Sequence, residues 1–445
     1  MKKLKYYIPF IFLGCLIILN LYGCKEEPPI VPPPPPPEKK DSIVVSIADI
    51  THRSVSVSLQ SAVFSPQSTT IKLFREFNST TNLVAELPGV ITDTTIIDDD
   101  NGAGLLLDET YSYYAVIIDS TGNVKDTSST VTARTLAPTT HNYTWTEYTI
   151  GEWQSYLTDV WGTDENNVYA VGSLTINGEN YSVLHYNGSE WTPVEDTVGG
   201  FSIFGFSAND IWVAGGGVYH YDGIKWRQVD AKGINGFSEI LDTVLHENAP
   251  YTSLWGTSSS NLYLGNIYGK IIHWDGEKAD VMNIQASVRI TDIYGITENI
   301  IYATAGNTGV EWIGELYQLN GGSWELIKTG SNFPSGDQLR APFNSVWTYD
   351  NTELYVVGDR VNRRINNNWE VENLYEYLEK IRGTKPNNLF ICGHHKSIAH
   401  YNGIDWMMYE LGEQTILQGL YITTNKAFVV GTDGSNAKIL IGIKN

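Results

Sequence analysis

The sequence is poor in cysteine and in positive charge. Three of its 445 residues are Cys, and only Cys392 lies beyond residue 24, so no disulfide can form within the rest of the chain. Its 29 Lys and Arg stand against 50 Asp and Glu, which gives a formal net charge of −21. Such an acidic excess argues against a nucleic-acid partner and against electrostatic binding to anionic lipid.

Motifs of common catalytic and metal sites are also scarce. There is no Gly-x-Ser-x-Gly, no His-Glu-x-x-His and no phosphate-binding loop. The run Cys-Gly-His-His at 392–395 lacks a third nearby ligand for zinc once Cys392 is aligned with a strand position of the repeat described below. Residues 98–104, with Glu109, resemble a calcium loop, but Ala103 stands where that loop needs Gly. We therefore favour structural roles for both segments and predict no metal and no cofactor.

The sequence repeats a short pattern in which an aromatic residue is followed by a turn that contains Gly and then by Trp. It occurs as Tyr-Asn-Gly-Ser-Glu-Trp at 186–191, and its further copies lie at 221–226, 274–276, 319–324, 365–369 and 401–406. Asn-Gly and Asp-Gly are typical of two-residue hairpin turns, because both positions tolerate positive φ. The pattern predicts a hairpin in which the aromatic residue packs against the Trp.

Other short apolar segments complete each unit. In the first unit they lie at 159–163, 167–172 and 182–186, and Trp191 opens a fourth at 191–194. From Trp161 to Tyr421 the pattern takes six steps of about 43 residues, the length of a four-stranded propeller blade. We therefore predict that residues 142–445 form a seven-bladed β-propeller.

The last unit has three strands and then ends. A spare strand at 143–148 precedes the first unit, and its Trp-Thr-Glu-Tyr matches Trp-Thr-Pro-Val at 191–194. We predict that this N-terminal strand completes the last blade and removes its open edge.

Four histidines recur one residue before the turn aromatic. They are His185, His220, His273 and His400. Because a side chain that returns once per unit belongs to the repeat, we predict a structural role for all four.

Residues 1–23 have the pattern of a targeting segment, with three Lys before a mostly apolar run. Leu-Tyr-Gly-Cys at 21–24 resembles the bacterial lipobox, which implies cleavage before Cys24 and lipid, including palmitate, on that residue. A plain signal peptide or an uncleaved anchor is the alternative. Lys-Glu-Glu at 25–27 resembles a surface-export signal of Bacteroidetes-type lipoproteins. The resemblance implies an outer-membrane or cell-surface location, with the lipid anchor as the only membrane contact.

Two segments separate this anchor from the predicted propeller. Residues 24–40 form a Pro-rich linker, with an unbroken Pro run at 32–37 that is typical of a semi-rigid spacer. Residues 41–136 are predicted to form a separate all-β domain, in which 54–59 and 71–75 alternate in polarity as half-buried strands do. Leu107, a turn and Tyr113, followed by an apolar run, resemble the fibronectin type III domain, with Tyr113 at the tyrosine-corner position. Leu59 stands where that family usually has Trp. This resemblance implies an all-β sandwich used for spacing or adhesion.

The turns also resemble a known propeller motif. Gly-Ser-Glu-Trp at 188–191 is similar to the end of the Asp-box of sialidases and to kelch-type propellers, although Asn187 replaces the Asp and sits next to the Gly. The box is structural in its own family, so it implies no glycoside cleavage. A sialidase would also need three converging Arg, and Arg340, Arg360, Arg363, Arg364 and Arg382 do not recur at equivalent first-strand positions.

Loop lengths divide the predicted propeller into two faces. Connections between first and second strands are short, as at 163–167, and third-to-fourth connections are tight turns, so we call this side the plain face. The long insertions at 173–181, 231–250, 305–314 and 329–342 lie between second and third strands or between blades. Both of these connection types emerge on the other side, the elaborated face. Function concentrates on variable loops held by a rigid scaffold.

These loops predict the binding site. Trp312 lies in an insertion outside the repeated Trp positions, and an exposed Trp offers a flat apolar surface to a ligand. Glu311, His246, Asp337 and Arg340 on the same or neighbouring loops could supply hydrogen bonds. The sequence thus predicts a non-catalytic binding protein for a glycan or protein ligand. The alternative is an extracellular polysaccharide hydrolase or lyase, which would need a carboxylate pair with a perturbed pKa on this face.

Overall fold

The computed structural model describes residues 40–64, 66–195, 199–229, 250–365, 368–372, 374, 376–412 and 414–445. The predicted signal segment at 1–23, Cys24 and nearly all of the Pro-rich linker lie outside these ranges, as does His246. Residues 41–445 form one compact unit. Within the described ranges the helices are two short 3₁₀ turns, Pro66–Ser68 and His394–Lys396, and no helix is long and apolar enough to span a membrane. The prediction of an all-β chain is confirmed.

Residues 42–134 form two antiparallel sheets. One has the strand order β1-β2-β5 and the other has the order β4-β3-β6-β7, with β8 paired to β6. The strands are β1 (Ser42–Ile50), β2 (Val55–Ala62), β3 (Thr69–Phe77), β4 (Thr80–Pro88), β5 (Asp93–Asp98), β6 (Thr110–Asp119), β7 (Val124–Thr127) and β8 (Val131–Arg134). Alternate residues of β2 and β3 are buried, among them Val57 and Leu73, and together with residues of β1 and β6 they form one apolar core. The polarity pattern of the sequence therefore marks the inward side of each strand.

The tyrosine predicted to form a corner is the wrong one. The hydroxyl of Tyr113 donates to Asp98 Oδ2 at 2.9 Å, so this buried side chain joins an ion pair between Asp98 and Arg75. The neighbouring Tyr111 instead accepts a hydrogen bond from the backbone N–H of Leu106, five residues upstream, at 2.9 Å. A bond of that kind defines a tyrosine corner. The two tyrosines lie on the same side of one strand, and only the three-dimensional position of Asp98 distinguishes them.

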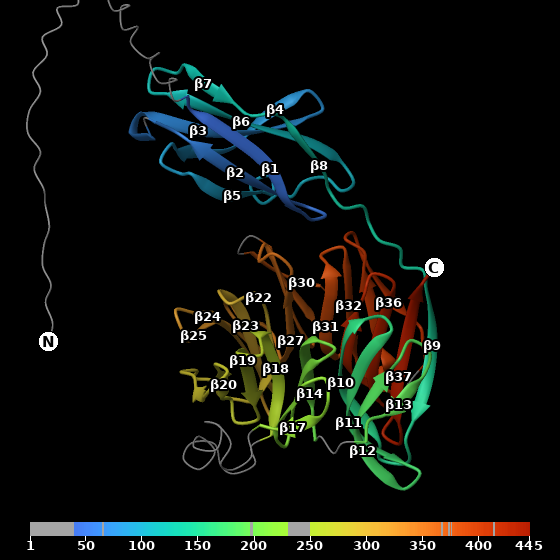
Figure 1. The fold of residues 1–445 in the computed structure, drawn as a ribbon. Coiled ribbons are helices and arrows are strands. Elements are labelled where there is room, and N and C mark those ends of the chain that lie inside the picture. The colour runs from blue at the N-terminus through green and yellow to red at the C-terminus, as the bar shows by residue number, and fades with distance from the viewer. Residues whose placement is uncertain are drawn as a thin grey trace, which may run out of the picture. The chain divides into compact units, whose positions relative to one another are not determined.

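Residues 143–444 form seven further sheets, which we number ring sheets 1 to 7 in chain order (Figure 1). Sheet 1 holds β10 (Tyr156–Asp164), β11 (Asn167–Ile176), β12 (Glu179–Tyr186) and β13 (Trp191–Pro193). Sheet 2 holds β14 (Ser202–Ser207), β15 (Asp210–Ala214), β16 (Val218–Tyr221) and β17 (Trp226–Gln228). Sheet 3 holds β18 (Tyr251–Ser258), β19 (Asn261–Asn266), β20 (Ile271–Trp274) and β21 (Ala279–Val281).

Ring sheet 4 carries one extra strand. It holds β22 (Ile290–Thr297), β23 (Ile300–Thr308), β24 (Trp312–Asn320), β25 (Ser323–Ser331) and the two-residue β26 (Leu339–Arg340), which pairs parallel to β25. Sheet 5 holds β27 (Phe343–Thr348), β28 (Glu353–Gly358), β29 (Val361–Ile365) and β30 (Asn368–Glu372). Sheet 6 holds β31 (Leu378–Lys385), β32 (Asn388–Gly393), β33 (Ile398–Tyr401) and β34 (Trp406–Tyr409). Sheet 7 holds β35 (Ile416–Ile422), β36 (Lys426–Thr432), β37 (Ala437–Lys444) and β9 (Tyr143–Ile150).

The seven sheets close into a ring. The first strand of each sheet contacts the first strand of the next, and β35 of the last sheet contacts β10 of the first. Strand β9 pairs antiparallel with β37 over eight residues, from Ala437 opposite Ile150 to Lys444 opposite Tyr143. The prediction that the N-terminal strand completes the last sheet is therefore confirmed, and the edge of β37 is covered.

The repeated aromatic–Gly pair joins neighbouring sheets. A methyl group placed on Gly205 would lie 2.6 Å from the ring of Trp161, and one on Gly295 would lie 2.7 Å from the ring of Trp255. The same contact closes the ring, since Gly162 of sheet 1 faces Tyr421 of sheet 7. In these three pairs the aromatic residue fills the space that the glycine of the following sheet leaves open. This packing explains why the two residue types recur together.

The recurring turns differ from the predicted two-residue type. At Asn187, Asp222, Asp275 and Asn402 the loop has four residues, and only its Gly has positive φ. The side-chain oxygen of Asn187 accepts hydrogen bonds from the backbone N–H groups of Ser189 and Glu190, each at 3.0 Å. The Asn or Asp is therefore selected because its side chain stabilises the loop, not because it adopts positive φ. Predicted contacts across the turn are confirmed, with Tyr186 and Trp191 rings 5.1 Å apart.

The four repeated histidines share one structural environment. In each of them Nε2 lies within hydrogen-bond distance of an Asn or Asp side chain at the start of the second strand, as His185 Nε2 does of Asn167 Oδ1 at 2.7 Å. Each ring also stacks on an aromatic residue of that strand, as His400 does on Phe390. Burial lowers the pKa of His400 to about 3, so this histidine is neutral near neutral pH. The predicted structural role of the four is confirmed.

Candidate functional site

Most first strands of the ring carry a one-residue bulge at the same place. The register shifts opposite the second strand at Thr158, Thr252, Thr291, Asn344, Glu379 and Gln418. A bulge bends its strand and re-aims the extra side chain. In sheet 2 the equivalent residue, Phe201, lies immediately before β14. The seven positions all lie at or just before the beginning of the first strand, where the connection from the preceding sheet arrives on the elaborated face.

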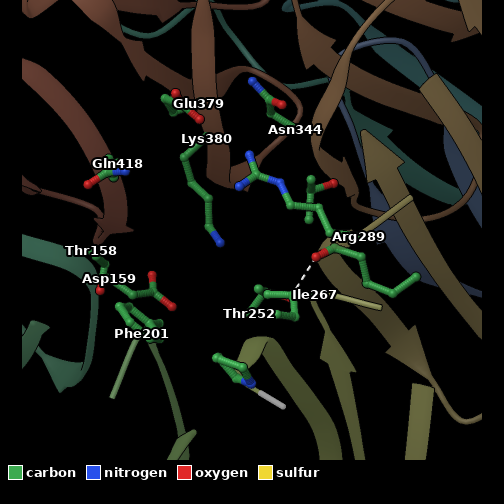
Figure 2. Close-up of a pocket in the computed structure, with 13 residues that line it drawn as sticks. Thr158, Asp159, Phe201, Thr252, Ile267, Arg289, Asn344, Glu379, Lys380 and Gln418 are labelled. Carbon is green, nitrogen blue, oxygen red and sulfur yellow. Dashed lines mark hydrogen bonds between the residues drawn. The ribbon is translucent and has the colours of Figure 1, made fainter. Parts of the chain in front are cut away.

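These seven side chains surround one cavity, which we call the axial pocket (Figure 2). Its volume is about 350 Å³, and its other lining residues are Asp159, Pro250, Ile267, Arg289, Ile290 and Lys380. Since every ring sheet contributes one residue at the equivalent position, the pocket lies where the seven first strands converge. Polar side chains predominate, and Phe201 and Ile267 provide an apolar part of the wall.

Three of the bulged residues also hold the ring together. Thr252 Oγ1 donates to the carbonyl of Ile290 in the next sheet at 2.6 Å, and Thr291 Oγ1 donates to that of Phe343 at 2.8 Å. Asn344 Nδ2 donates to the carbonyl of Leu378 at 2.8 Å. Among the residues that the structure describes, Thr158, Glu379 and Gln418 make no such bond to the next sheet. The wall therefore has a structural side, sheets 3 to 5, and a side whose polar groups are freer.

A buried ion cluster adjoins the pocket. Asp292, 1% exposed, receives two hydrogen bonds from the Arg382 guanidinium, at 2.9 and 2.8 Å, and one from Lys380 Nζ at 3.1 Å. Burial alone would raise the pKa of Asp292, but the two cations overcome this effect and hold it below its ordinary value. Arg382 also lies over the ring of Tyr294, 5.1 Å from its centroid. No sequence pattern indicated this cluster, because its members come from sheets 4 and 6.

Trp312 lies beside the pocket on an extended hairpin. The predicted insertions at 305–314 and 173–181 continue the second and third strands, so that Thr308 pairs with Trp312 and Ile176 pairs with Glu179. Half-buried Trp312 meets Tyr377 edge to face at 6.3 Å, and Tyr377 contacts His394 at 4.7 Å. We call Trp312, Tyr377 and His394 the aromatic shelf. His394 Nε2 lies 2.9 Å from Glu379 Oε1, so the shelf adjoins the pocket wall.

The other predicted site residues are spread over the neighbouring loops. Glu311 is exposed beside Trp312. Asp337 pairs with Lys328, and Arg340 Nε donates to Asp359 Oδ2 at 3.1 Å while its guanidinium also donates to the Asn332 carbonyl. None of the three belongs to the lining of the axial pocket. That these three residues bind a ligand remains a prediction.

The pocket residues were missed although the repeat marks them. Each lies four residues before the recurring Gly, as Thr158 does before Gly162, or before its substitute Thr348 or Ile422. An alignment of the seven units on that Gly would have shown a column of mainly polar residues. The polarity pattern alone did not, because a bulge breaks the alternation that marks inward and outward sides.

Among the described residues, no group of three or more His, Cys, Asp and Glu side chains is placed to hold a metal ion. In the Cys-Gly-His-His run, Cys392 is buried in β32, His394 pairs with Glu379, and His395 Nδ1 lies 2.9 Å from Glu376. In the loop that resembles a calcium site, Asp98 and Asp100 both pair with Arg75. These side chains thus have partners within the protein.

The closed ring of small radial sheets around an axial pocket is the architecture of a β-propeller. No protein-family model matches the chain, and no curated protein matches it. Among solved structures the chain is similar to BamB from Moraxella catarrhalis, with 13% sequence identity, 90% of this chain and 98% of that chain covered, and a TM-score of 0.24. So low a score carries no argument about this protein.

Proposed function

We propose that this protein is a non-catalytic, lipid-anchored binding protein of the outer membrane or cell surface. In this proposal Cys24 carries the lipid and residues 24–40 act as a spacer. Residues 41–136 form a fibronectin type III domain, and residues 142–445 form a seven-bladed propeller that binds a glycan on its elaborated face. The observation that carries the proposal is the convergence of seven equivalent first-strand residues on one pocket at that face.

The composition of the pocket suits a sugar. A pocket of about 350 Å³ lies at the small end of ligand sites, which favours a single sugar unit over a protein segment. Its neutral side chains, including Thr158 and Gln418, match hydroxyl groups, which both donate and accept. Phe201, 39% exposed, gives an apolar surface for a ring face. The aromatic shelf adjoins another part of the pocket wall, at Glu379, where a neighbouring unit of a chain would lie.

The alternative, a polysaccharide hydrolase or lyase, has less support. Glycoside hydrolysis requires a carboxyl group that stays protonated near neutral pH beside a second, ionised one. Burial raises the pKa of Asp350 and Glu372, but neither lines the axial pocket. Asp292, which adjoins it, has its pKa lowered instead. The two carboxylates that line the pocket, Asp159 and Glu379, hold Ser202 and His394, which favours binding over acid–base chemistry in this proposal.

Replacing Trp312 by Ala should weaken ligand binding by roughly 1–3 kcal/mol while the fold stays intact, because Trp312 is half-buried at the end of a hairpin. The soluble form from Asp41 onward would first be screened on a glycan array, and affinities of the identified glycan would then be measured by calorimetry. Glu165→Ala in a short connection of the plain face is the control and should bind normally. If no glycan on the array binds, the proposed function is wrong. If Trp312→Ala binds like the wild type, the shelf takes no part.

A further inference from the structure

The carboxylates of the axial pocket already have their hydrogen-bond donors. Asp159 is 7% exposed, and its oxygens accept from the backbone N–H groups of Val160 at 3.0 Å and Ile203 at 3.2 Å and from the Ser202 hydroxyl at 3.0 Å. Glu379 pairs with His394 at 2.9 Å. Each carboxylate thus serves to fix neighbouring strands or side chains.

The cations of the pocket, in contrast, have hydrogen-bonding capacity that no residue in the described ranges uses. Lys380 donates to Asp292, and Arg382 donates to both oxygens of the same carboxylate. Because the single negative charge of Asp292 is shared by two cations, it does not balance the charge of the Lys380 ammonium group. Arg289 is exposed and makes no side-chain hydrogen bond or ion pair with any other residue that the structure describes. Figure 2 shows the Arg289 guanidinium and the Lys380 ammonium group pointing into the same cavity. The unsatisfied hydrogen-bonding capacity of the pocket is therefore mainly that of positively charged donors.

Arg289 also lies near the aromatic shelf. Burial raises the pKa of Tyr377 and the negative charge of Glu379 acts in the same direction, while a hydrogen bond with Asn344 and the positive charge of Arg289 oppose them. Tyr377 is thus close to two lining residues of the pocket. A ligand group held by Arg289 would lie at the boundary between the pocket and the shelf.

We infer that the axial pocket selects a sugar unit that carries a carboxylate, such as a hexuronate, and that Arg289 binds this carboxylate with Lys380 beside it. The inference rests on the proposed function and names its ligand class. A guanidinium group matches the two oxygens of a carboxylate in a planar, bidentate arrangement, and charge-assisted hydrogen bonds are the stronger kind. The hydroxyl groups and ring face of the same unit would meet Thr158, Gln418 and Phe201.

The overall charge restricts the polymer further. A protein with a formal net charge of −21 repels a densely charged polyanion. Salt screens the attraction of the two pocket cations at greater distance, so they act only over a short range. The ligand that fits both conditions is a heteropolysaccharide in which acidic units are separated by neutral ones.

The experiment compares one oligosaccharide in two chemical forms. An oligosaccharide with alternating glucuronate and neutral units, and the same oligosaccharide after reduction of its carboxyl groups to alcohols, would be titrated by calorimetry into the full soluble chain. We expect the acidic form to bind roughly ten- to a hundredfold more tightly, as one charge-assisted contact predicts. Arg289→Gln should remove this difference, and Arg289→Lys should retain part of it. Lys225→Gln, which removes one exposed positive charge from a turn on the plain face, should change nothing.

The outcomes separate the inference from the proposed function. If both forms bind equally and with useful affinity, the protein binds glycans but the carboxylate assignment is overturned. If neither form binds, the inference also fails, and the glycan array alone decides the proposed function. Arg289-dependent binding of an acidic peptide in place of either sugar would overturn the assignment to a glycan. Thermal denaturation of each variant would show that the fold is retained, as expected for an exposed side chain.

Discussion

Loss of strand β9 is expected to destabilise the whole ring. Replacing residues 142–149 by a Gly-Ser segment of equal length keeps the chain connected but removes the partner of β37. It also removes Tyr143, 8% exposed, which packs against Phe390 and Tyr409. Because an unpaired edge and an opened aromatic cluster both result, the melting temperature should fall by roughly 10 °C or more.

A peptide of residues 142–150 gives the matched test of this prediction. Added in excess, it should pair with β37 and restore much of the lost stability, whereas a peptide of scrambled sequence should not. Circular dichroism against temperature would follow both. An unchanged melting temperature in the replaced protein would show that the ring does not depend on closure by its N-terminal strand.

Asp292→Asn is expected to cost about 3–5 kcal/mol of unfolding free energy, since it leaves two largely buried cations without their buried carboxylate. The substitution preserves size but removes the charge that Arg382 and Lys380 share. Urea denaturation would measure the loss. Combining it with Arg382→Gln should cost less than the sum of the two single changes, because the residues form one network.

Asp280→Asn is the control for this cluster. Asp280 also pairs with a lysine, Lys278, but both side chains are more than half exposed, at 63% and 61%. An exposed pair of this kind contributes about 0–1 kcal/mol. If the two Asn variants lose similar, small amounts of stability, the buried cluster is not an important support of the ring.

Much of the fold could be predicted because it rests on local rules repeated many times. Alternating polarity placed strands of the N-terminal domain, and the repeated turns and apolar segments placed those of the ring. The missing fourth strand of the last unit identified β9 as its partner. The details that were predicted wrongly, the turn type and the tyrosine corner, depend on side-chain contacts. Asn187 holds its turn through its own amide oxygen, and Tyr111 rather than Tyr113 bonds to upstream backbone. Neither contact can be inferred from the pattern of polar and apolar residues.

The candidate site was less predictable, for a physical reason. Long loops directed attention to Trp312, which does lie beside the pocket through Tyr377. The pocket itself is made of single residues from seven sheets, such as Thr158, Glu379 and Gln418, brought together only by ring closure. Arg382 stands where Trp161 stands in the first sheet, so the ion pair with Asp292 looked like a departure from the repeat rather than a feature.

Filling the axial pocket tests the central claim most directly. Gln418 is a bulged residue on the wall, and Gln418→Trp should place a large side chain in the cavity. Glu298→Trp in an exposed first-to-second connection of the plain face adds the same side chain at a distance. We predict that Gln418→Trp abolishes binding of the array-identified glycan with a melting temperature close to that of the wild type, and that Glu298→Trp binds normally. Normal binding by a folded Gln418→Trp protein would contradict the account.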